Sequence, residues 1–128
     1  MALRERIFHG QKRSAGVKAH GTLAATGTQS LDIDLSKGDI HTVTTKTGAT
    51  SAVSFNLKSV YKGAKVMIIF TSAVASDTFG VVEIEGTDVS TDLIVGTIND
   101  EAVNMIEITV LDPAPASGSI VMSIRAVA

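Results

Sequence analysis

The chain has 128 residues and a formal net charge of −2, and this length fits one domain that buries a core of its own. Hydrophobic residues make up 45% and charged residues 19%, which is ordinary for a folded domain and argues against disorder along the whole chain. The absence of cysteine excludes thiolate nucleophiles, disulfides and zinc–thiolate sites, and the lack of tryptophan is unusual for proteins that stack sugars or bases.

Basic residues are concentrated at the N-terminus, where residues 1–20 hold five of the eleven and a single acid, Glu5. We expect these residues to form an arm ahead of a domain at 21–128, and an extended arm is favoured over a short helix at 2–9. Apolar anchors beside the charges favour a protein partner over nucleic-acid phosphates or solvated disorder. The expected contact residues of the arm are Arg4, Arg6, Ile7, Phe8, Lys12, Arg13 and Lys18.

The arm lacks the apolar segment of a secretory signal, because charges stand where that segment belongs. The longest strictly apolar run, residues 66–70, is far shorter than the ~20 residues of a membrane span. We therefore expect neither export by that route nor a membrane helix.

Residues 31–43, "LDIDLSKGDIHTV", allow two interpretations: a calcium loop, or a strand, a turn and a second strand. A calcium loop of the EF-hand type that starts at Asp32 needs glycine at its sixth position and glutamate at its twelfth, and these positions hold Lys37 and Val43. Apolar and polar residues also alternate here, as they do along a half-buried strand. We therefore expect Asp32 and Asp34 on a solvent-facing strand surface, with Gly38 in the turn.

Similar segments follow along the rest of the chain. "VSFNL" alternates, "VMIIFTS" has the continuous apolar run of a central strand covered on both sides, and further strands are expected in "FGVVEIEG", "DLIVGTI", "VNMIEITVLD" and the last ten residues. Polar turns separate them at 8 to 12 residue spacing. This pattern predicts an all-β fold of about eight strands, specifically an antiparallel β-sandwich of the jelly-roll kind with an extended N-terminal arm.

No catalytic, cofactor or metal site is predicted. His9, His20 and His41 are scattered, and we expect them to be solvated or at an interface. Nucleophile-elbow and phosphate-loop motifs do not occur. Glu83 and Glu85 are expected to share the polar face of one strand, opposite Val82 and Ile84, which is the ordinary exterior of a half-buried strand.

Residues 30–70 contain D-L-S-x-G-D at residues 34–39, T-G-x-T at 47–50, a strand with Phe55 and Leu57, and the turn Lys62-Gly63. In this order they resemble a segment common in virion proteins of tailed bacteriophages. It covers a third of the chain and implies a β-sandwich in a homotrimer on the particle surface.

From the resemblance we expect a non-enzymatic virion structural protein that is made in the host cytoplasm. A capsid decoration (cement) protein is favoured, because the chain has a basic arm and no long shaft. Its expected partners are copies of itself and the major capsid protein. The alternatives are a tail fibre or other tail component, a carbohydrate- or cell-surface-binding module, and a nucleic-acid packaging protein.

Overall fold

The computed structural model describes residues 16–89, 94–114 and 119–127. Within them the chain is all-β, as expected, with one short 3-10 helix, η1 (Leu35–Lys37). The strands are β1 (Val17–Thr22), β2 (Gly27–Asp34), β3 (Ile40–Thr44), β4 (Ser51–Lys58), β5 (Lys65–Thr71), β6 (Thr78–Ile84), β7 (Thr87–Asp88), β8 (Ile94–Val95), β9 (Val103–Val110) and β10 (Ile120–Val127).

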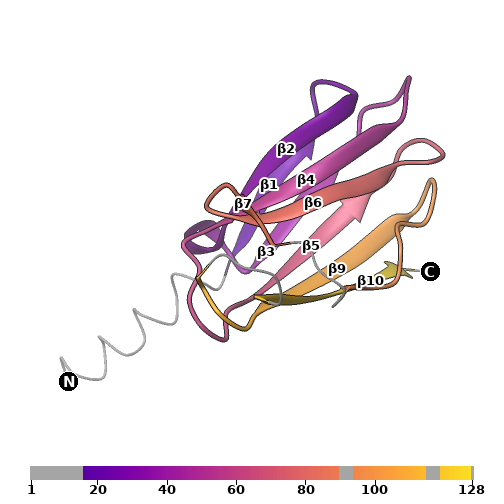
Figure 1. Cartoon of the computed structure of the whole chain (residues 1–128). Coiled ribbons are helices and arrows are strands. Elements are labelled where there is room, and N and C mark those ends of the chain that lie inside the picture. The colour runs from indigo at the N-terminus through magenta and orange to yellow at the C-terminus, as the bar shows by residue number, and fades with distance from the viewer. Residues whose placement is uncertain (1–15, 90–93, 115–118, 128) are drawn as a thin grey trace.

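The strands form two facing sheets. Sheet A has six strands in the order β1-β3-β5-β9-β10-β8, and sheet B has four in the order β2-β4-β6-β7. From β1 to β6 successive strands alternate between the sheets, and neighbours within each sheet are parallel. Each pair of strands is therefore one coil: β1–β2 is the first, β3–β4 the second and β5–β6 the third (Figure 1).

The fold is a β-solenoid of stacked coils, so the expected antiparallel, jelly-roll-like sandwich is wrong. The alternation along each strand reports which side chains face inward, but it carries no information on which strand lies alongside. The short polar turns resemble hairpin loops, yet each of the first five carries the chain across to the opposite sheet.

Among the strands that the structure describes, antiparallel pairing is confined to the C-terminal end of the solenoid. There β9 pairs with both β5 and β10, and β7 pairs with β6. The expected count of about eight strands is close to the ten observed in the described residues, since β7 and β8 have only two residues each.

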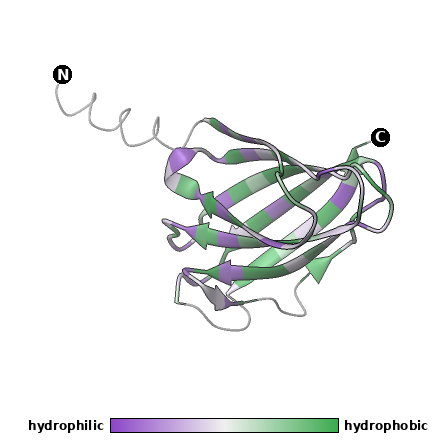
Figure 2. Cartoon of the chain, turned by 90° about the horizontal axis from the view of Figure 1, so that it is seen from above, coloured by the Kyte–Doolittle hydropathy of each residue, from purple (hydrophilic) through white to green (hydrophobic). Residues whose placement is uncertain are grey.

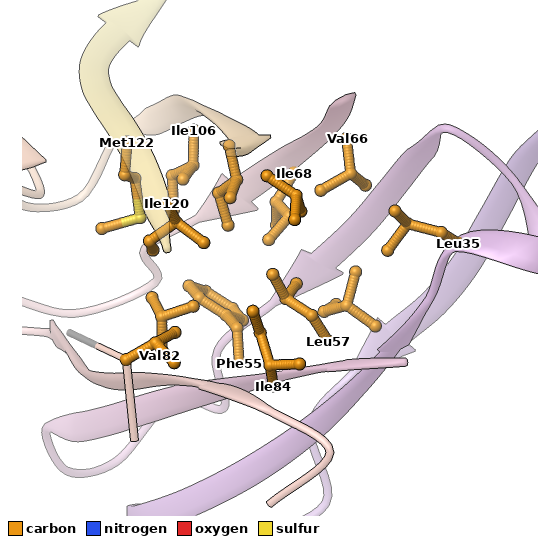
Figure 3. Close-up of a cluster of buried hydrophobic side chains, with 14 of the residues drawn as sticks. Leu35, Phe55, Leu57, Val66, Ile68, Val82, Ile84, Ile106, Ile120 and Met122 are labelled. Atoms are coloured by element: carbon orange, nitrogen blue, oxygen red, sulfur yellow. The ribbon is translucent and has the colours of Figure 1, made fainter. Parts of the chain in front are cut away.

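The core lies between the two sheets and is built from the inward-facing half of each strand. Along β4 buried and half-buried residues alternate without a break, and Phe55 at its centre meets Phe70 of β5 edge-on, with ring centroids 6.1 Å apart. Figure 3 shows these aliphatic and aromatic side chains meeting in the space between the sheets. Burying one such side chain contributes about 1.5–3 kcal/mol, so the stacked interior supplies the main driving force for folding.

Hydropathy alternates along the strands in the same way as burial does. Apolar and polar residues alternate along most of the ribbons in Figure 2. β5 departs from it: it is central in sheet A, as expected, but only one of its faces is buried, because Met67 and Ile69 on the other face are half-exposed. The described residues therefore cover this strand on one side only, where cover on both sides was expected.

Candidate functional site

Most of the predicted arm lies outside the described residues. This applies to Arg4, Arg6, Ile7, Phe8, Lys12 and Arg13. β1 already begins at Val17, inside the segment expected to be the arm, and Lys18 is an exposed residue of this strand. The first described residue, Gly16, is fixed to the second coil, since its carbonyl accepts hydrogen bonds from the backbone N–H groups of Asp39 and Ile40, both at 3.2 Å.

A histidine pair joins β1 to β3. Nε2 of His20 lies 2.8 Å from Nδ1 of His41, and the two rings stack with centroids 5.1 Å apart. Nε2 of His41 lies 3.1 Å from the carbonyl oxygen of Gly38. Because a carbonyl only accepts, His41 carries its proton on Nε2 in the neutral pair, and its Nδ1 accepts from Nε2–H of His20.

The surroundings of the pair disfavour protonation. Burial lowers the pKa of His20 below its ordinary value, and the neighbouring His41 and Lys18 lower it further. Burial also lowers the pKa of His41, which is completely enclosed, although hydrogen bonds to the backbone of Gly38 and Asp34 oppose this effect. Two neutral imidazoles, rather than two cations, therefore hold this edge strand in place.

The expectation of solvated or interface histidines is wrong for His41, and His9 lies outside the described residues. A sequence signal was present: His41 is two positions from Val43 on one strand, and residues at that spacing face the same side. The partnership with His20 had no such signal, since it depends on the parallel pairing of β1 with β3. Among the described residues, no group of three or more His, Asp or Glu side chains is arranged to hold a metal ion.

The aspartates of residues 31–39 are on the surface, as predicted, and do not form a calcium loop. Asp34 caps η1, accepting from the amide of Ser36 at 2.9 Å and from its hydroxyl at 2.7 Å, and these hydrogen bonds hold the pKa of Asp34 below its usual value. Asp32 accepts from Nδ2 of Asn56 at 3.2 Å and lies 3.8 Å from the ammonium of Lys58. The carboxylate of Asp34 thus caps η1, and that of Asp32 contacts side chains of the neighbouring strand β4.

Glu83 and Glu85 do not share a strand face. Glu83 lies on β6, as expected, with Val82 and Ile84 buried on the opposite side. β6 ends at Ile84, and Glu85 follows in a turn with a left-handed φ of 47°. The alternation does not show where a strand ends. Because β6 ends before Glu85, the expected shared face of Glu83 and Glu85 is not formed.

The buried carboxylate of Asp77 is a feature that the sequence did not reveal. It accepts hydrogen bonds from the hydroxyl of Thr45 at 2.6 Å, the backbone N–H of Ser51 at 2.7 Å and the hydroxyl of Ser72 at 3.0 Å. These donors come from the corners of the second and third coils. Since the carboxylate is occupied by three donors, we assign it the structural role of tying one corner to the next.

The outer face of sheet A presents apolar side chains at the centre of its strands. Ile69 of β5 lies in register with Thr42 of β3 and Met105 of β9. The residues two positions before and after these on each strand face the same way and continue the surface. Its apolar members, from half-exposed to exposed, are Ile40, Met67, Ile69, Val103, Met105 and Val127. We call this set the sheet A patch. Scattered surface hydrophobics are normal, whereas large contiguous apolar patches are candidates for interaction surfaces.

A groove of about 280 Å³ lies at one end of the sheet A patch, where β3, β5 and β9 run side by side. Its lining combines the apolar Ile40 and Met67 with the charged Asp39, Lys65 and Glu107. Protein interfaces have an apolar centre and a polar rim, and the groove has residues of both kinds.

In comparisons with protein-family models, with curated proteins and with solved structures, nothing matches this chain. In the part of the chain that the structure describes, no helix has the length and apolar character needed to span a membrane.

Proposed function

We propose that this chain is a non-enzymatic structural protein of a tailed-phage particle, where it decorates and stabilises the head. The sheet A patch packs against copies of the same chain in a homotrimer, and the basic arm contacts the capsid shell. The resemblance of residues 30–70 to phage virion proteins supports the particle, and the surface of the solenoid supports the mode of action.

The observation that carries the proposal is the uncovered face of β5. This strand is apolar on both faces, a composition typical of strands that are buried on both sides. Among the described residues only the inner face of β5 is buried, and Met67 and Ile69 stay half-exposed on the other. A second protein surface that covers this face supplies the missing burial.

A copy of the same chain suits this surface because charges of both signs border the sheet A patch. Lys65 lies on β5, Glu107 on β9, and Arg125 of β10 lies 3.6 Å from Glu107. In a homotrimer the same face of each chain lies at the threefold axis, and cations of one copy then meet acids of the next.

The location of the protein in the particle is tested by immunogold labelling of intact virions. We expect gold over the head at many positions. Label confined to the tail would replace decoration by a tail role, and particles without label would remove the virion assignment.

The role of the arm is tested by co-sedimentation of the purified protein with undecorated heads. A truncation of residues 1–15 leaves β1 intact, because β1 begins at Val17. We expect the truncated chain to stay folded and to lose head binding, whereas undiminished binding would overturn the assignment of the arm. A control variant, Glu83→Gln on the outer face of β6, should bind as the wild type does.

A further inference from the structure

One edge of the solenoid is a complete strand with no neighbour among the described residues. The edges of sheet A are β1 and β8, and those of sheet B are β2 and β7. β7 and β8 have two residues each, and a register shift interrupts β1. In contrast, β2 pairs with β4 over eight residues without a shift and leaves its other side free.

Proteins protect edge strands with bulges, lysine, proline or short length, because a free row of N–H and C=O groups recruits another strand. β1, β7 and β8 show such protection. The sequence of β2, "GTQSLDID", has neither lysine nor proline. At this end of the solenoid Leu23 and Leu31 pack against the core but remain only partly buried. Among the described residues, therefore, one edge of β2 has no strand partner, and Leu23 and Leu31 at this end are not fully covered.

The spacing of the coils indicates which segment belongs there. In sheet B the step is 24 positions from β2 to β4, where Gly27 pairs with Ser51, and 26 to 27 positions from β4 to β6. A step of 24 backward from β2, residues 27–34, leads to residues 3–10, which lie outside the described residues. Residues 11–16 then remain as the connection to β1, and this length matches residues 35–39 and 59–64, which connect the strands of sheet B to the next strand of sheet A.

We propose that residues 3–10 of the same chain pair in parallel with the free edge of β2 and complete one further half-coil of the solenoid. Gly16, bonded to Asp39 and Ile40, brings the chain to the corner from which this half-coil starts. The occupant is thus a segment of this chain, and its length and point of attachment fit the edge.

This register sets an apolar residue against Leu31. With a step of 24, Ile7 aligns with Leu31 and faces inward together with Leu3, and Glu5 and His9 lie on the same side, where Glu5 aligns with the polar Gln29. Arg4 and Arg6 face outward, where Arg6 aligns with Ser30 and stands diagonally opposite Asp32. The inward side covers the partly buried leucines, and the outward cations meet an acidic strand.

This inference does not depend on the proposed function. In the completed half-coil Arg4, Arg6 and Phe8 face outward and remain able to contact a capsid shell. Failure of head binding leaves the half-coil standing, and failure of the half-coil leaves the virion assignment standing.

Disulfide trapping tests the proposal, and the cysteine-free chain provides a clean background. Neighbouring strands lie ~4.8 Å apart, within the range that a disulfide spans. In the full-length double variant Ile7→Cys with Leu31→Cys, we expect mild oxidation to give a disulfide within one chain, seen as a faster non-reduced monomer without free thiols. The matched control, Arg6→Cys with Leu31→Cys, places the thiols on opposite faces and should oxidise at least tenfold more slowly.

Equal oxidation rates in the two variants would overturn the register, and covalent dimers or persistent free thiols would overturn pairing within one chain. Hydrogen exchange on the protein without cysteines gives a second test. Removal of residues 1–15 should speed amide exchange in β2 at least tenfold and leave the central strand β9 unchanged, whereas unchanged exchange in β2 would contradict the proposal.

Discussion

The imidazoles of His20 and His41 share a hydrogen bond of 2.8 Å between the edge strand β1 and its only neighbour within the described residues, β3. Burial and the charge of Lys18 lower the pKa of both histidines, whereas a hydrogen bond to the backbone of Asp34 and its carboxylate charge raise the pKa of His41. If both rings were protonated, two cations would meet at hydrogen-bond distance and no acceptor would remain between them. The hydrogen bond that joins β1 to β3 is therefore sensitive to pH.

The first prediction is that the free energy of unfolding falls as the pH drops from 7.5 to 5.0. The pKa of each histidine is lowered in the folded state. Below pH 6.5, the ordinary pKa of histidine, the unfolded chain therefore binds more protons than the folded protein does. The stabilisation is complete above pH 6.5 and declines as the pH falls toward the folded-state pKa. Urea unfolding at the two pH values measures the decline.

The control for this prediction is His20→Gln, which keeps a side-chain donor but cannot titrate. It should show a shallower decline than the wild type over the same range. The lowered pKa of Asp34 acts below its ordinary value of 3.8 and so outside this range. An equal decline in both proteins would show that the histidine pair is not its source.

The second prediction concerns the corner network around Asp77. Asp77→Ala should lower the free energy of unfolding by about 2–4 kcal/mol, because Ser51 N–H and two hydroxyls lose a charged acceptor in a buried corner. The matched control is Asp100→Ala: its carboxylate accepts from the amide of Ser76 at the surface, and its loss should cost less than about 1 kcal/mol. Similar losses in the two variants would refute the structural role of Asp77.

The third prediction concerns the close approach of two glycines. A Cβ added at Gly38 would lie 2.6 Å from the carbonyl oxygen of Gly16, so Gly38→Ala should push the start of β1 off the corner and cost about 1–3 kcal/mol. Gly16→Ala is the control, because its Cβ comes no closer than 3.9 Å to the carbonyl oxygen of Lys37. If thermal unfolding shows that the two variants are equally stable, the backbones are not packed as tightly as the structure has them.

The sequence allowed the strands and their inward faces to be predicted, because alternation is a local property of each strand. The alternation of Val53, Phe55 and Leu57 identifies the buried side of β4. The choice of partner strand is not local, since the same face is buried whether the next strand is a hairpin neighbour or lies in the opposite sheet. This is why the solenoid was mistaken for an antiparallel sandwich.

The candidate sites were less accessible from sequence for the same reason. The position of Asp34 at the surface could be predicted, because it depends on the local alternation and its hydrogen bonds to Ser36 are local as well. The pairing of His20 with His41 and the donors of Asp77 are brought together only by the stacking of the coils, across 21 and 32 positions in the longest cases. The predicted arm residues other than Lys18 lie outside the described residues, and their role in binding stays a prediction.

The most direct test of the account is the molar mass of the purified protein by light scattering, since the proposed function depends on association through the sheet A patch. We predict a mass near three times the 13.3 kDa of one chain, a fall to one chain in Ile69→Lys, and no change in Thr28→Lys on the other sheet. A wild-type protein that stays at 13.3 kDa even at millimolar concentration, with Ile69→Lys indistinguishable from it, would contradict the account.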